Sequence, residues 1–426
     1  MATVTTDTPS RTRKWFDRRT PPTLFTLVAM AGMGALSMNI FLPSMPGMAK
    51  GFGVDYSVMQ LAVSLYLLAM AVLQLVIGPL SDRLGRRPVL LGGLAIFALA
   101  TIGCLTAETI EGFMAYRMLQ TTSSAGLVLS RAMVRDMSTQ ETAAQMMGYV
   151  AMCMAVVPMV GPLIGGLLDQ AFGWHANFVV LLVASLSVLA VCWADAGETN
   201  MNPTASFAEQ FRAYPELVRS HRFWGYALAC ACASGAFFAF LGGAPYVASE
   251  VLGLSPSKLG VYFMFMAGGY MVGNFLTTRL AARLGIDRMI VIGAVLNIVA
   301  MSASALMFLG GATDPLALFG PTFFVGIGSG MAMPNAMAGQ LSVRPHLAGS
   351  ASGLGSTLML GGGALLSAVT GWLLEVFGGA LPLPLVLVAT GFAMLGSMAF
   401  VYSANRRRGP LPAGDPAGGE RPGGPL

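Results

Sequence analysis

The apolar residues of this chain fall in blocks of about twenty, the length of helix that crosses the roughly 30 Å hydrocarbon core of a bilayer. Of the 426 residues, 55% are apolar and only 10% are charged, against about 25% charged residues in an average soluble domain. The five cysteines lie inside these blocks, where they indicate small apolar packing and no disulfide. The sequence therefore predicts an all-α integral membrane protein.

The blocks predict twelve transmembrane helices in two sets of six. The first set lies near residues 23–45, 57–80, 89–106, 112–134, 143–169 and 174–194. The second set lies near residues 223–247, 257–281, 286–309, 315–340, 347–375 and 380–402. The predicted segments are a cytoplasmic tail (1–22), a first bundle (23–194), a cytoplasmic linker (195–222), a second bundle (223–404) and a disordered cytoplasmic tail (405–426).

Lys and Arg gather on one side of the predicted helices, and short loops rich in them are retained in the cytoplasm. The loops of the other side carry acids: Asp55, Glu108, Glu111, Asp169, Glu250, Asp314 and Glu375. Residues 1–20 lack the pattern of a cleaved signal peptide. We therefore expect a multi-pass protein of the bacterial cytoplasmic (inner) membrane with both termini in the cytoplasm.

One short motif occurs twice, two hundred residues apart. Residues 80–85 read LSDRLG and residues 280–285 read LAARLG, and Gly93 and Gly293 share the same offset. This repeat predicts two parallel, pseudo-symmetric six-helix bundles. Such bundles enclose a cavity at the membrane midplane and rock to give alternating access.

The most specific string in the chain is GPLSDRLGRRP at residues 78–88. It resembles the loop 2–3 signature of the major facilitator superfamily, and the resemblance extends over almost all of residues 24–404. Three further segments resemble the bicyclomycin and chloramphenicol resistance (Bcr/CflA-type) exporters, a branch of drug/proton antiporters. These segments are residues 39–46 in helix 1, residues 158–166 in helix 5 and residues 348–353 in helix 11.

The resemblance implies a cytoplasmic gate in which Asp82 pairs with Arg131 or Arg135. The whole gate set is Gly78, Asp82, Arg83, Gly85, Arg86, Arg87, Arg131 and Arg135. The implied antiporter motif is Pro158, Gly161, Pro162, Gly165 and Gly166. Val157 stands where that motif usually has its first glycine. The alternatives are a plain positive-inside loop and ordinary packing by small residues.

Four polar residues of helix 4 recur at i, i+3, i+4 and i+7, which predicts one polar stripe. They are Arg117, Gln120, Thr121 and Ser124. Such a face is expected to border water or protein and not lipid. Arg117 is the basic residue placed within a span, so it predicts a functional site, the alternative being an arginine that snorkels to the outer interface.

Asn39 of helix 1 lies at a depth similar to that of Arg117. The resemblance implies an aspartate at this position, where it takes part in proton coupling with the helix 4 arginine. An asparagine cannot titrate. A cavity with a fixed positive charge and no buried carboxylate is expected to favour neutral, zwitterionic or anionic molecules over lipophilic cations.

We therefore expect secondary active efflux of small amphipathic drugs or metabolites, with proton antiport as the resemblance implies. The alternatives are an uncoupled facilitator and a non-transporting membrane sensor of the same fold. The predicted substrate and coupling residues are Asn39, Gln74, Arg117, Gln120, Thr121, Ser124 and Asn335.

No predicted span carries a catalytic Ser/His/Asp set, a pair of carboxylates or a His/Glu metal set, so neither an enzymatic activity nor a metal site is predicted. No nucleotide-binding glycine loop occurs, so we expect no cofactor and no use of ATP. The expected partners are a small-molecule substrate and the lipid bilayer. Binding to nucleic acid is not expected, and the chain is expected to be a monomer.

Overall fold

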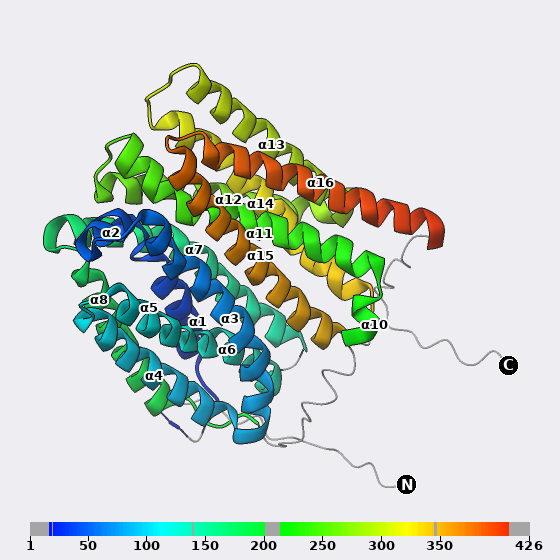
Figure 1. Cartoon of the computed structure of the whole chain (residues 1–426). Helices are drawn as coiled ribbons and strands as arrows, with labels where there is room; N and C mark the ends of the chain where they lie inside the picture. The colour runs from blue at the N-terminus through cyan, green and yellow to red at the C-terminus, as the bar shows by residue number, and fades with distance from the viewer. Residues whose placement is uncertain (1–16, 19, 139, 201–213, 345–346, 409–426) are drawn as a thin grey trace, which may run out of the picture.

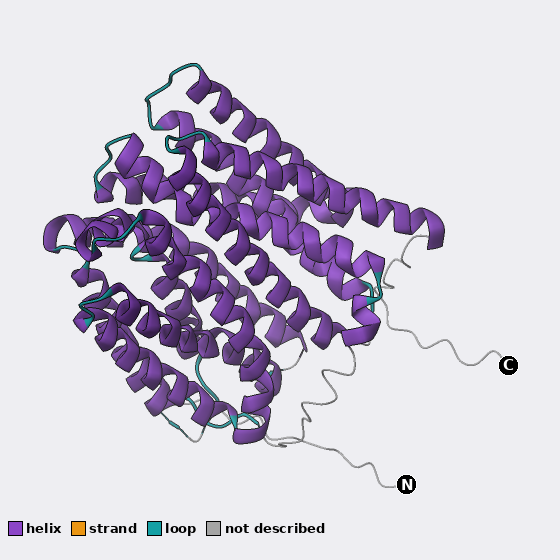
Figure 2. Cartoon of the chain, in the orientation of Figure 1, coloured by secondary structure: helices purple, strands orange, loops and turns teal. Residues whose placement is uncertain are grey.

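The computed structural model describes residues 17–18, 20–138, 140–200, 214–344 and 347–408. Every regular element in this part of the chain is a helix (Figure 2). The first half contains α1 (Leu24–Asn39), η1 (Leu42–Ser44), α2 (Met45–Phe52), α3 (Tyr56–Leu84), α4 (Arg86–Thr106), α5 (Ile110–Leu119), η2 (Gln120–Ser123), α6 (Ser124–Met137), α7 (Gln140–Phe172) and α8 (His175–Asp195). The second half contains α10 (Tyr214–Val218), α11 (His221–Tyr246), η3 (Val247–Val251), α12 (Pro256–Leu284), α13 (Ile286–Leu309), α14 (Leu316–Ser342), α15 (Ala348–Phe377) and α16 (Pro382–Arg408).

The predicted twelve helices are confirmed. Among the described residues, ten helices are long and apolar enough to cross a membrane. The fifth position belongs to α7, and the fourth to α5, η2 and α6 together. Most of the predicted tails (1–22 and 405–426) and residues 201–213 of the predicted linker lie outside the described residues.

Two of the predicted spans, the first and the fourth, are interrupted by turns of 3₁₀-helix. Pro43 and Pro46 interrupt the first span at η1, because a proline removes a backbone donor from the helix. In the fourth span the hydroxyls of Thr121 and Thr122 donate to the carbonyls of Met118 and Leu119 at 2.6 and 2.9 Å. These bonds compete with the regular helix ladder. The fourth span, made of α5, η2 and α6, is therefore not one regular α-helix at the predicted polar stripe.

The internal repeat is visible in the backbone. Helices α3 and α12 are both 29 residues long and end at Gly85 and Gly285. These glycines have φ of 97° and 81°, a region that L side chains avoid. In each half the next helix begins at the following residue. The duplicated six-helix halves predicted from the sequence are confirmed.

The two halves lie side by side, the first in blue and cyan and the second in green to red (Figure 1). They meet where α3 packs against α15 and where α7 packs against α12. We call the end that carries Gly85 and Gly285 the basic end, and the end that carries Asp55 and Glu250 the acidic end.

Candidate functional site

Among the fully buried side chains of the described residues, that of Arg117 is the largest. Its Nη1 donates to Ser37 Oγ at 3.1 Å and to Gln120 Oε1 at 2.7 Å, and its Nη2 donates to the Ser37 carbonyl at 3.0 Å. The guanidinium carbon lies 4.3 Å from the centre of the Phe41 ring and 4.2 Å from that of Tyr66. Arg117 forms no ion pair with a described residue. Hydroxyl, amide and aromatic groups therefore hold this cation in place of a carboxylate.

The hydrogen bonds around Arg117 continue across the first half. Gln120 Nε2 donates to Thr101 Oγ1 at 2.8 Å, and Thr101 Oγ1 donates to the Phe97 carbonyl at 2.7 Å. This chain of bonds runs from α1 through α5 and η2 to α4. The Arg117 Nε is left without a partner among the described residues. A partly satisfied buried network of this kind is costly to the fold and points to a functional role.

The polar stripe of the fourth span (α5, η2 and α6) borders protein. Arg117, Gln120 and Ser124 are fully buried, and Thr121 is 4% exposed. The prediction that the stripe avoids lipid is correct for this structure, but the expected exposure of Arg117 to a cavity is not found. Snorkelling is also wrong for Arg117, because its charged head points into the bundle toward Ser37.

Asn39 faces a different helix from the one that holds Arg117. Its Nδ2 donates to the Ala35 carbonyl at 2.7 Å, and its Oδ1 has no partner among the described residues. A Cβ on Gly161 of α7 would lie 3.3 Å from the Asn39 Cβ, and a Cβ on Gly165 would collide with the Ile40 carbonyl. Asn39 is therefore packed against the implied antiporter motif of α7, and among the described residues no hydrogen bond joins it to Arg117.

The rest of that motif packs between the halves. Pro158 and Pro162 lie inside α7. A Cβ on Gly166 would collide with the Pro256 carbonyl, and a Cβ on Gly260 would come within 2.6 Å of the Pro162 carbonyl. These glycines allow α7 and α12 to approach closely, as small residues do in membrane helices.

Gln74 and Asn335 lie apart from the Arg117 cluster. Gln74 is half-buried on α3. Asn335 is buried, and its Nδ2 donates to the Met331 carbonyl at 2.7 Å and to Thr277 Oγ1 at 3.4 Å. Asn335 thus bridges α14 to α12 within the second half.

The gate residues at the basic end have other partners than expected. Asp82 forms an ion pair with Arg86, whose Nε lies 3.0 Å from Asp136 Oδ2. The end of α6 is therefore joined to this loop by Asp136, and no ion pair of Asp82 with Arg131 or Arg135 is found among the described residues. Those two arginines, together with Arg83, have exposed side chains, and Gly78 has no neighbour within 4 Å of its Cβ position.

A segment after α8 contacts the predicted gate residues, an interaction that was not predicted from the sequence. The Glu198 carboxylate accepts from the Arg86 and Arg87 backbone amides at 2.8 and 3.0 Å, at the N-terminus of α4. Asn200 Nδ2 donates to the Asp82 carbonyl at 2.8 Å. A carboxylate at a helix N-terminus satisfies free amides and complements the helix dipole. The sequence contains a signal for this cap, since the acidic residue Glu198 follows closely on the end of α8 at Asp195.

The acidic end is sealed by side chains that cross between the halves. Tyr56 Oη donates to the Gly242 carbonyl at 2.6 Å, and Gln60 Nε2 donates to the Ser367 carbonyl at 2.5 Å. On the surface the Nζ of Lys50 lies 2.8 Å from Glu250 Oε1, and the Ser257 hydroxyl donates to Gln170. We call these contacts the acidic-end seal.

Gln60 sits in a slot walled by two glycines of the second half. A Cβ on Gly242 would lie 2.5 Å from Gln60 Nε2, and a Cβ on Gly371 would overlap Gln60 Oε1. Gln60 is 1% exposed, and its Oε1 has no partner among the described residues. The sequence predicts an interhelical hydrogen bond for such a residue but identifies neither the slot nor its helices.

Comparison with known proteins places this architecture in a family. Residues 27–367 match the family model of the Major Facilitator Superfamily. An uncharacterized MFS-type transporter of Bacillus subtilis (strain 168) is 30% identical over 90% of this chain and 96% of its own. A chloramphenicol resistance protein of Pseudomonas aeruginosa is 32% identical over 79% of this chain and 80% of its own. A bicyclomycin resistance protein homolog of Haemophilus influenzae is 27% identical over 81% of this chain and 89% of its own.

The fold agrees with that of a solved transporter. A bacterial homolog of the human lysosomal transporter Spinster, solved in an inward-facing and unoccupied conformation, superposes with a TM-score of 0.70 at 16% identity. The match covers 90% of this chain and 96% of that one. The resemblance to the resistance exporters is confirmed by their names among the relatives. The chain belongs to the major facilitator superfamily.

Proposed function

We propose that the chain is a secondary active exporter of small amphipathic drugs or metabolites that works by alternating access. One observation carries this proposal: the halves are bonded to each other across the acidic end, whereas the described gate bonds at the basic end lie within the first half. A rocking transporter closed on one side has this arrangement. The relatives named for chloramphenicol and bicyclomycin resistance support drugs as cargo.

The orientation follows from charge. The basic end faces the cytoplasm of a bacterial inner membrane, with both termini on that side, because Lys and Arg are retained there. The acidic-end seal is then the outward gate. A compound that enters from the cytoplasm leaves when this seal opens.

The charge of Arg117 sets the preferred cargo. Arg117 lies inside the first half without a carboxylate partner, so its positive potential is not cancelled locally. In a low-dielectric protein this potential acts beyond direct contact. Neutral, zwitterionic or anionic compounds are therefore favoured over lipophilic cations. Because Arg117 is fully buried and bonded to Ser37 of α1, its charge would act on the cargo at a distance and not by direct contact.

The proton is carried by a carboxylate other than the residue at position 39, where an amide stands. Asp169 has the best position for this role. It is half-buried near the acidic end of α7, the helix of the implied antiporter motif, and lies near the hydroxyl of Ser44 in η1. Protonation of Asp169 would thus change the charge next to η1, the turn that interrupts the first span between α1 and α2.

The test is accumulation of labelled chloramphenicol in cells that express the native chain, with the proton gradient intact or collapsed. A coupled exporter lowers accumulation below the external level only while the gradient stands. An uncoupled facilitator, which the amide at Asn39 favours, equalises the two levels with or without the gradient. Export by the Asn39→Asp variant alone would support that second reading, and an unchanged level in every strain would contradict both.

A further inference from the structure

Two arginines at the basic end of the first half contact the same tryptophan. Trp193 lies in the last turn of α8 and is 58% exposed. The guanidinium carbon of Arg18 lies 5.7 Å from the centre of the Trp193 ring, and Arg87 Nη2 donates to the Trp193 carbonyl at 2.9 Å. Arg18 belongs to the segment before α1, and Arg87 to the first turn of α4. Three segments that are far apart in the sequence therefore bring two cations to the end of one span.

The backbone of Arg18 is held against the chain that follows α8. The Gly197 amide donates to the Thr20 carbonyl at 3.1 Å, and a Cβ on Gly197 would lie 3.0 Å from the Arg18 carbonyl. The segment before α1 is therefore packed in place beside Trp193. A ligand that binds Arg18 consequently orders less of the chain than it would in a free tail.

Both guanidinium groups keep N–H donors for a ligand. Neither forms an ion pair with a described residue, including Asp17, the acid next to Arg18 in the sequence. Arg87 Nε is buried and has no hydrogen-bond partner among the described residues. Two other nearby acids are engaged elsewhere: Asp195 is 1% exposed and accepts from two threonine hydroxyls, and the Glu198 carboxylate accepts from four backbone amides. The two arginines are therefore available to an external anion.

The exposed face of α8 leads to this pair of arginines. Five exposed apolar residues recur every three or four positions along the helix, which places them on one stripe: Val179, Val183, Leu186, Ala190 and Trp193. Since α8 is long and apolar enough to span a bilayer, acyl chains cover this stripe. An exposed tryptophan at the end of a span lies at the membrane interface. The two guanidinium groups are therefore at the level of the lipid headgroups.

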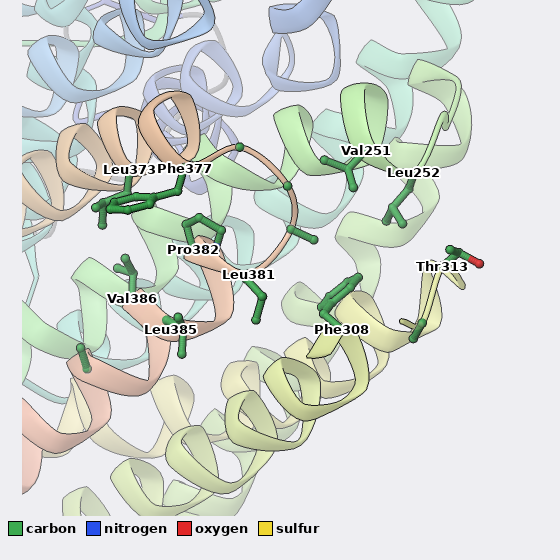
Figure 3. A pocket seen from close by; sticks show the side chains of 15 residues that line it. Val251, Leu252, Phe308, Thr313, Leu373, Phe377, Leu381, Pro382, Leu385 and Val386 are labelled. Atoms are coloured by element: carbon green, nitrogen blue, oxygen red, sulfur yellow. The ribbon is translucent and has the colours of Figure 1, made fainter. Parts of the chain in front are cut away.

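A hollow of about 810 Å³ at the acidic end of the second half offers no comparable charge. Figure 3 shows Phe308 and Leu381 facing each other across it, and Thr313 is the one polar side chain among the described residues of its wall. An apolar wall of this kind accepts many apolar groups and does not distinguish between headgroups. The arginines beside Trp193 differ because charge restricts what they bind.

We propose that Arg18 and Arg87 bind the phosphate of an anionic phospholipid, as in phosphatidylglycerol, whose acyl chains lie along the exposed stripe of α8. A guanidinium group suits a phosphate because its planar N–H groups form paired, charge-assisted hydrogen bonds. A headgroup with a net negative charge is favoured, since it has no ammonium group for the two arginines to repel. The lipid thereby joins the segment before α1 to the start of α4 and the end of α8.

Quenching of Trp193 fluorescence by brominated lipid tests this proposal. Four of the five tryptophans of the full chain are replaced by phenylalanine, so that Trp193 alone reports. The protein is reconstituted in phosphatidylcholine with increasing fractions of brominated phosphatidylglycerol or of brominated phosphatidylcholine. Bromine quenches only at close contact, so the fraction that gives half of the quenching measures relative affinity. Phosphatidylglycerol should have an advantage on the order of tenfold, because each basic residue at the interface favours an anionic lipid.

Two pairs of substitutions locate the source of this preference. The Arg18→Gln, Arg87→Gln variant should be quenched equally by the two lipids, and Arg18→Gln alone, at an exposed side chain, should reduce the advantage to about threefold. The matched control is Arg279→Gln, Arg283→Gln, which removes two exposed arginines from the basic end of the second half and should keep the full advantage.

Equal quenching of the parent by the two lipids, or an unchanged advantage in both Arg18 variants, would overturn the proposal. Loss of the advantage in the control pair would assign the preference to the overall charge of the basic end and would overturn it too. Release of brominated phosphatidylglycerol from the parent by inorganic phosphate would show a site for a soluble anion in place of a lipid.

Discussion

The slot around Gln60 yields the sharpest prediction. Gly371→Ala places a methyl group where the Gln60 amide oxygen lies, and the atom it meets is the far end of a flexible side chain. The amide can leave the slot without unfolding the bundle. It then gives up the bond to the Ser367 carbonyl, which joins the two halves. The substitution should therefore weaken the acidic-end seal and leave the fold intact.

The size of the effect follows from that bond. A hydrogen bond contributes about 0.5–1.5 kcal/mol net, and a buried polar group left without its partner, here the Gln60 amide, costs about 1–3 kcal/mol. A loss of about 2 kcal/mol shifts the equilibrium between the closed and open acidic end about thirtyfold. Gly361→Ala is the matched control, since it lies in the same helix and a Cβ there meets nothing within 4 Å.

Electron spin resonance would measure this shift as the distance between labels on Asp55→Cys and Lys258→Cys, two exposed positions at the acidic ends of α3 and α12, in a background without the native cysteines. Gly371→Ala should add a population with a longer distance, and Gly361→Ala should match the parent. Identical distance distributions for all three chains would refute the role of the slot.

Three other predictions concern the first half. Arg117→Met should leave thermal unfolding in detergent unchanged or raise its midpoint, because the buried cation has no carboxylate to compensate its desolvation, while drug export is lost; normal export would contradict a functional role. Asp169→Asn should abolish the dependence of export on the proton gradient at normal membrane abundance, and retained dependence would place the proton elsewhere. Glu198→Gln should lower the free energy of unfolding by about 1 kcal/mol through loss of charge at the α4 N-terminus, whereas Glu108→Gln, at an exposed acid, should not; equal effects would remove the proposed capping role.

Much of the fold could be predicted because a bilayer constrains each span separately. Span length, the side on which Lys and Arg gather and the repeat around Gly85 and Gly285 can be judged one segment at a time. The polar stripe from Arg117 to Ser124 could be predicted for the same reason, since a polar face avoids lipid whatever lies against it. The choice between water and protein for Arg117 depended on the rings of Phe41 and Tyr66, which come from two other helices.

By itself, the sequence determined the twelve helices, their duplication and the residues that must avoid lipid. Only the tertiary structure decided which groups satisfy those residues. Gln60 meets Ser367 across 307 positions, and Glu198 caps Arg86 across 112. The physical reason is that a buried polar group requires a partner, but its residue type does not specify which one. Helix packing makes that choice, and in this protein it separates Asn39 from Arg117 and brings Asn39 against the glycines of α7.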